Sequence, residues 1–122
     1  MGIRCFWLEK VGERWRRADT GAEFDAPYEA GVGAIYDAPW LRGEDWRGYG
    51  VKLYPDGLSV CVITPDGPWV IDGPSYDGTQ HHPCPWTRSG DPRTPSSFSV
   101  TPSINFPGRY HGWLRNGELI PA

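Results

Sequence analysis

The chain has 122 residues, the length of one ordinary domain, and such a chain can bury roughly two-thirds of the surface that its unfolded form exposes. Its formal net charge of −3 gives no electrostatic attraction to a nucleic-acid backbone, so we do not expect a nucleic-acid partner. No long apolar run is present, so no membrane-spanning segment is predicted.

The composition favours strands and loops over helices. There are 16 glycines and 13 prolines, and the longest segment without either, Ile3 to Val11, is shorter than an average helix. Seven tryptophans, six tyrosines and four phenylalanines argue against disorder. We therefore expect a single all-β domain over residues 1–122, an antiparallel meander or small sandwich with long Gly/Pro-rich loops and little helix.

An N-terminal hairpin is predicted over residues 3–17. Ile3 to Leu8 and Trp15 to Arg17 flank a turn around Gly12. Because side chains alternate between the two faces of a strand, Cys5 and Trp7 should lie on one face and Phe6 and Leu8 on the other.

A three-stranded meander over residues 51–72 is predicted to form the core. Its strands would be Val51 to Leu53, Leu58 to Ile63 and Trp69 to Asp72. The two connections each contain Pro-Asp-Gly, in which proline presets the first turn dihedral and glycine accepts a positive φ. The buried face should consist of Leu58, Val60, Val62, Trp69 and Ile71, with Ser59, Cys61 and Ile63 on the other.

The C-terminal strands are predicted within residues 97–120. Ser97 to Thr101 alternates apolar and hydroxyl side chains, and Arg109 to Arg115 continues through Asn116-Gly117, a type I′ turn signal, into Glu118 to Ile120. Residues 21–50 and 73–96 are predicted to be irregular, and connections of that length are usually functional or mobile.

Histidine and cysteine are the candidates for metal binding or nucleophilic catalysis. A zinc site would need His82, Cys84 and His111, but the standard paired ligand spacings are missing, so no metal or other cofactor is favoured. Cys84 with a histidine could instead act as a nucleophile. The cysteines are odd in number and no apolar leader precedes them, which predicts free thiols in a cytosol.

Aromatic recognition is the favoured chemistry, because exposed Trp, Tyr and Arg side chains are typical of binding hot spots. We expect Trp86 and the other loop tryptophans to be exposed, and the loop at 81–86 to form one surface with the strand at 110–113. The candidate contact residues are Trp40, Trp46, His81, His82, Trp86, Tyr110, His111 and Trp113.

Four motifs occur in an order that resembles small uncharacterised proteins of tailed bacteriophages and prophages. They run from Gly33 to Trp40, from Pro65 to Gly73, from His81 to Cys84 and from Tyr110 to Gly117. In that group, the third motif reads His-His-Cys-Trp, which Pro83 and Pro85 interrupt here. A fainter likeness links the C-terminal half to a bacterial family of unknown function with a cysteine cluster, of which this chain keeps one cysteine. The resemblance implies a phage origin and no established activity.

The sequence therefore favours a phage-encoded accessory protein without catalysis that binds another protein, either a host factor or a virion subunit. It would act in the cytoplasm of the infected bacterium or in the virion. A small-ligand or carbohydrate-binding module with an aromatic pocket is one alternative. A zinc-binding protein or cysteine/histidine enzyme is the other.

Overall fold

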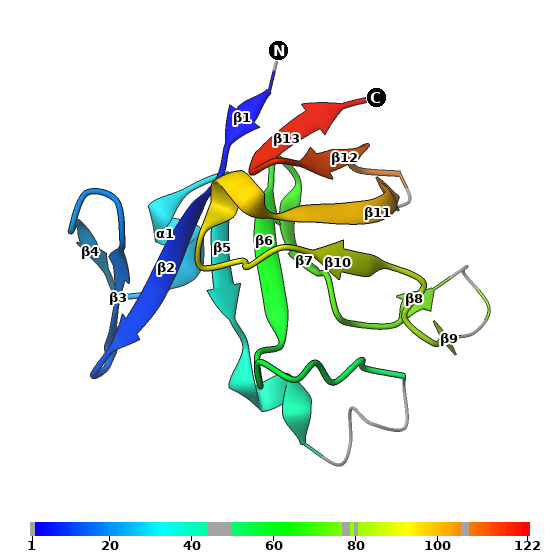
Figure 1. The fold of residues 1–122 in the computed structure, drawn as a ribbon, viewed down its shortest axis with the longest axis horizontal. Coiled ribbons are helices and arrows are strands. Elements are labelled where there is room, and N and C mark those ends of the chain that lie inside the picture. The colour runs from blue at the N-terminus through cyan, green and yellow to red at the C-terminus, as the bar shows by residue number, and fades with distance from the viewer. Residues whose placement is uncertain (1, 44–49, 77–78, 80, 106–107) are drawn as a thin grey trace.

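The computed structural model describes residues 2–43, 50–76, 79, 81–105 and 108–122, and this part of the chain is an all-β fold built on two sheets (Figure 1). The six-stranded sheet has the order β4-β3-β2-β5-β6-β7, with β2 (Phe6–Val11), β3 (Arg14–Arg17), β4 (Glu23–Phe24), β5 (Ala34–Asp37), β6 (Val60–Thr64) and β7 (Gly67–Val70). The five-stranded sheet has the order β1-β13-β12-β11-β10, with β1 (Ile3–Arg4), β10 (Thr87–Ser89), β11 (Ser99–Asn105), β12 (His111–Arg115) and β13 (Glu118–Pro121). The remaining elements are the ribbon of β8 (Ser75–Tyr76) and β9 (His81–His82), helix α1 (Pro27–Ala30), and the 3-10 turns η1 (Pro39–Arg42) and η2 (Pro95–Ser97).

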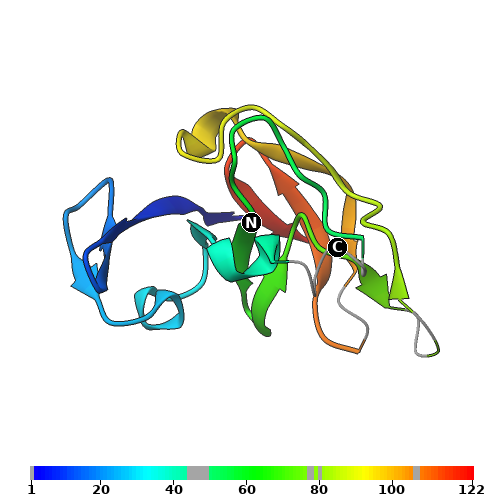
Figure 2. The same ribbon diagram turned by 90° about the horizontal axis from the view of Figure 1, so that it is seen from below.

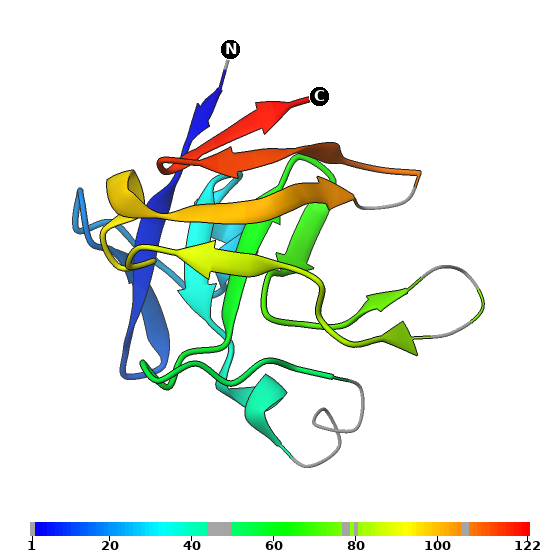
Figure 3. The ribbon, with the colours of Figure 1, turned by 45° about the vertical axis from the view of Figure 1, so that its right-hand side comes forward.

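The two sheets pack face to face, and their strands run across one another (Figure 3). The main core lies between them, because one buried cluster combines Val60 and Val62 of β6 with Val100 of β11, Leu114 of β12 and Leu119 of β13. The N-terminal strand joins both sheets, since β1 pairs with β13 and β2 pairs with β3 and β5. The described part of the chain is therefore a sandwich whose two sheets are joined at one corner by the N-terminal segment, which passes from β1 in one sheet to β2 in the other.

A second, smaller core covers the other face of the six-stranded sheet. Phe6, Leu8 and Tyr36 pack there against Leu41 of η1, with Ala30 of α1 at the margin. In Figure 2, β3, β4 and α1 extend to one side of the sandwich and the β8–β9 ribbon to the other. Both faces of β5, of β6 and of the first half of β2 are therefore buried.

Three of the hairpins predicted from local turn chemistry are confirmed, whereas the one predicted across Pro55-Asp56-Gly57 does not form. β2 and β3 pair across a two-residue turn, β6 and β7 pair across Pro65 and Asp66, and β12 and β13 pair across Asn116 and Gly117. The last two residues both have positive φ, at 47° and 74°, as a type I′ turn requires. The predicted faces are also confirmed, because alternate residues of β2 and of β6 fall into the two different cores.

Three of the strand predictions are wrong. Val51 to Leu53 is not a strand, although the Lys52 backbone N–H donates to the Asp72 carbonyl at 2.9 Å, and Leu58 precedes β6. The predicted irregular stretch at 21–50 contains β5, whose residues Ala34, Ile35 and Tyr36 are buried, and the stretch at 73–96 contains β10. β5 was missed because its partners are distant: it pairs with β2 in parallel and with β6 in antiparallel orientation.

No helix in the described part of the chain is long and apolar enough to cross a membrane.

Candidate functional site

Strand β12 carries three large side chains on the outer face of the five-stranded sheet. His111, Trp113 and Arg115 alternate with Gly112 and Leu114, which are buried. Leu114 belongs to the main core, on the inner face of this sheet. Because side chains alternate along a strand, His111, Trp113 and Arg115 therefore lie on the outer face. We call His111, Trp113 and Arg115 the β12 stripe.

The side chains of the β12 stripe are arranged around the tryptophan. The rings of His111 and Trp113 lie 6.2 Å apart between centroids, at an interplanar angle of 35°. The Arg115 guanidinium carbon lies 4.9 Å from the Trp113 ring centroid, a cation–π contact. On the far side, the His111 Nε2 is 3.3 Å from the hydroxyl of Ser103 on β11. These contacts hold the half-buried indole in place before any partner binds.

Apolar, charged and hydroxyl side chains of the neighbouring strands surround the β12 stripe. On β13, Ile120 is directly opposite Trp113, and Glu118 is opposite Arg115. The exposed hydroxyl groups come from β10 and β11, at Thr87, Ser89 and Thr101. In the described part of the chain, Arg115 forms no ion pair, although Glu118 is its cross-strand neighbour. One guanidinium and one indole on this face are therefore available to a partner.

The expected exposure of Trp86 is wrong. Its indole lies in the main core with 6% of its surface exposed, packs edge-on against Trp69 at 4.5 Å, and donates from Nε1 to the Ser103 carbonyl at 3.1 Å. Tyr110 is equally buried in the same cluster. The loop at 81–86 and the strand at 110–113, which were predicted to form one surface, therefore meet in the core through Trp86 and Tyr110. Within the strand segment 110–113, only His111 and Trp113 face outward.

The other candidate residues do not lie in the β12 stripe. Trp40 is 57% exposed on η1, whose Leu41 packs in the smaller core on the opposite side of the six-stranded sheet. His82 is half-buried in the β8–β9 ribbon, where His81 is described only by its position in β9. Trp46 lies outside the described residues.

All three cysteines are buried free thiols. Burial raises the pKa of Cys5 and of Cys61 to about 12 and also raises the pKa of Cys84. The Cys84 sulfur lies 3.3 Å from the Ile71 carbonyl oxygen. Because the thiolate is the nucleophilic form, this environment works against catalysis by Cys84.

The residues of the candidate zinc site do not converge. Cys84 points into the main core, whereas His111 lies on the outer face of the five-stranded sheet. Among the described residues, no group of three His, Cys, Asp or Glu side chains is arranged to hold a metal ion.

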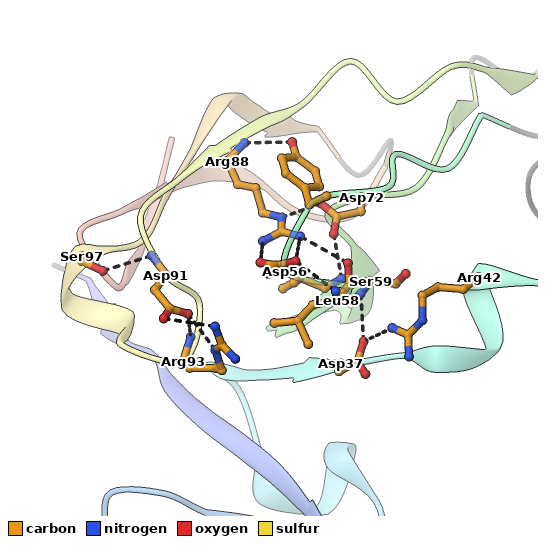
Figure 4. A network of polar contacts seen from close by, with 12 residues as sticks. Asp37, Arg42, Asp56, Leu58, Ser59, Asp72, Arg88, Asp91, Arg93 and Ser97 are labelled. Atoms are coloured by element: carbon orange, nitrogen blue, oxygen red, sulfur yellow. Dashed lines mark hydrogen bonds and ion pairs between the residues drawn. The ribbon is translucent and has the colours of Figure 1, made fainter.

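A buried charge network that the sequence reasoning missed lies on the inner side of β10, around Arg88 (Figure 4). The Arg88 guanidinium donates from Nε to Asp72 at 3.1 Å and from both Nη atoms to Asp56, at 2.6 and 3.1 Å. Its carbon also lies 3.8 Å from the Tyr54 ring centroid. The side chains of Arg88 and Asp72 are 3% and 1% exposed, so the pair is almost wholly removed from water.

This network connects the two sheets. Asp72 follows β7 and accepts the Val60 backbone N–H of β6 at 2.9 Å, while Arg88 belongs to β10. Burial raises the pKa of Asp72, although the Val60 N–H and Arg88 both favour its charged form, and the Arg88 hydrogen bonds lower the pKa of Asp56. With every charge paired inside the fold, the network is a structural support of the sandwich. The sequence placed Asp56 in a Pro-Asp-Gly turn and Asp72 at the end of a predicted strand, but no local pattern connected either residue with Arg88.

Comparisons of this chain with models of protein families, with curated proteins and with solved structures found no match.

Proposed function

We propose that this chain is a non-catalytic accessory protein, encoded by a tailed bacteriophage or prophage, that binds another protein through the β12 stripe. The partner would be a host factor or a virion subunit. The phage origin rests on the order of the four sequence motifs described above. The binding role rests on one observation, the outward row of His111, Trp113 and Arg115 in contact with one another on the outer face of the five-stranded sheet.

The composition of the β12 stripe matches what protein interfaces use. Trp and Arg are enriched among residues that dominate binding free energy, and a tryptophan held by its neighbours loses little conformational entropy on binding. Because Arg115 lacks an ion-pair partner in the described part of the chain, the complementary surface should present a carboxylate beside an apolar side chain. The stripe is a strand surface, whereas the sequence had favoured a loop surface.

The partner can be identified by cross-linking from the same face. Thr101 is exposed on β11 and pairs with Thr87 of β10, so a photoreactive residue there would report on what covers the sheet. The captured protein would then be purified, and its Kd for the intact chain compared with that for two variants. Trp113→Ala removes the centre of the stripe, and Trp40→Ala removes an exposed tryptophan on the opposite side.

We expect Trp113→Ala to weaken binding by about 2 kcal/mol or more, roughly 30-fold in Kd, because it removes the hot-spot side chain. Its thermal stability should change little, since an outward cross-strand pair such as Trp113 and Ile120 contributes only about 0.2–1 kcal/mol. Trp40→Ala should bind normally. Equal binding by all three proteins, loss of binding only in Trp40→Ala, or capture of nucleic acid instead of protein would each contradict the proposal.

A further inference from the structure

A groove of about 350 Å³ runs beside the N-terminal strand, away from the β12 stripe. The groove is lined by residues from Arg4 to Trp7 of the N-terminal strand, by the loop from Arg93 to Ser96, and by Ala18 and Asp19. Pockets for small ligands begin at about 300 Å³. We call this feature the N-terminal groove.

The loop from Arg93 to Ser96 is held by its own hydrogen bonds. The Thr94 N–H donates to the Asp91 carbonyl and the Ser97 N–H to the Thr94 carbonyl, both at 2.9 Å. Gly117 joins this loop to the N-terminal strand: its N–H donates to the Phe98 carbonyl at 2.9 Å, and its carbonyl accepts the Cys5 N–H at 2.7 Å. A side chain at Gly117 would collide with the Pro95 carbonyl, so the close approach depends on glycine. The groove is thus formed before any ligand enters.

The charges that line the N-terminal groove favour an anion. Arg4 forms no ion pair within the described part of the chain. The Arg93 guanidinium bonds to Asp91 through Nε and one Nη, at 3.1 and 3.5 Å, which orients it and leaves further N–H donors. Asp19 is the one acidic residue of the lining, and Arg17 already pairs with it, at 2.9 and 2.7 Å. The balance of unpaired charge in the groove is positive.

The other lining residues indicate what the ligand should carry besides its charge. Trp7 and Cys5, which are 9% and 5% exposed, contribute a small apolar surface to one wall, and Thr94 and Ser96 lie in the opposite wall. We infer that the N-terminal groove binds a small organic anion, with its carboxylate or phosphate group between Arg4 and Arg93 and its apolar body against Trp7. This function is separate from protein binding by the β12 stripe and uses none of the stripe's residues.

The inference can be tested by amide NMR titration of the full chain with four probes. Phenyl phosphate and benzoate carry an anionic group on an aromatic ring, inorganic phosphate lacks the ring, and benzyl alcohol lacks the charge. We expect at least one of the two ring anions to shift the amides of residues 4–7 and 93–96 saturably. Inorganic phosphate should bind at least tenfold more weakly, and benzyl alcohol should cause no saturable shift. Which ring anion binds more tightly identifies the head group.

The double variant Arg4→Gln, Arg93→Gln should weaken binding of the preferred probe at least tenfold. Both side chains are exposed, so the rest of the spectrum should report an intact fold. Arg14→Gln, which changes an exposed arginine of β3 outside the groove, is the matched control and should bind normally. No saturable shift with either ring anion, equally tight binding of benzyl alcohol or of inorganic phosphate, or full binding by the double variant would overturn the inference. None of these results depends on whether a protein partner exists.

Discussion

Replacing Arg88 by methionine should remove a large share of the stability of the protein. The variant leaves Asp72 buried at 1% side-chain exposure without its cationic partner, and it also breaks the paired hydrogen bonds to Asp56. Removing one partner of a buried ion pair typically costs about 3–5 kcal/mol, against a total stability of about 5–15 kcal/mol for a domain. Methionine retains most of the apolar length, so the cost would come from the charge.

The stability deficit of Arg88→Met should also depend on pH. Burial raises the pKa of Asp72 above its unfolded value of about 3.9, and loss of Arg88 would raise it further. An acid with a raised pKa destabilises the fold above that pKa, and the penalty is relieved as the pH falls and the carboxyl is protonated. Asp56 also makes the difference in unfolding free energy between native protein and variant larger at neutral pH. Its lowered pKa stabilises the native protein at neutral pH, and this contribution is lost in acid. The difference between native protein and variant should therefore be greatest near pH 7 and smaller near pH 4.

Urea unfolding of both proteins at pH 7 and pH 4 measures this difference. Arg93→Met is the matched control, because the Arg93–Asp91 pair is about half exposed, at 52% and 45%, and water screens such surface pairs, so its loss should change the stability little. A loss below about 1 kcal/mol at pH 7 for Arg88→Met, or a loss of equal size at both pH values, would refute the structural role of the network.

Two further predictions concern the core. Trp86→Ala should cost about 3–5 kcal/mol of unfolding free energy in a denaturant melt, because it empties a buried site against Trp69 and removes the hydrogen bond to Ser103; a loss under 1 kcal/mol would mean that the indole is not packed there. Burial of the three thiols should make the native protein react with a disulfide reagent at pH 8 only as fast as it opens, so adding urea should accelerate labelling strongly; rapid labelling without urea, above all at Cys61, would contradict this burial.

Local sequence chemistry determined the parts of the fold that depend on neighbouring residues. The turn at Asn116-Gly117 was predictable because only a few residue types accept positive φ at both positions. The division of β2 and β6 into two faces followed from strict alternation along the strand, which needs no knowledge of the partner strands. His111 and Trp113 could be singled out as candidate site residues by type alone.

The tertiary structure decided which of these residues are inside. β5 is a strand because β2 and β6 enclose it, and pairing with distant strands leaves little signal in four residues that lie among glycines and prolines. Trp86, which immediately precedes β10, and Trp113 of β12 have the same chemistry, yet the first is buried against Trp69 of the opposing sheet and the second faces outward. The partners of Arg88 come from segments 16 and 32 residues away along the chain. Burial and ion pairing depend on which segments meet across the sandwich, and no local pattern contains that information.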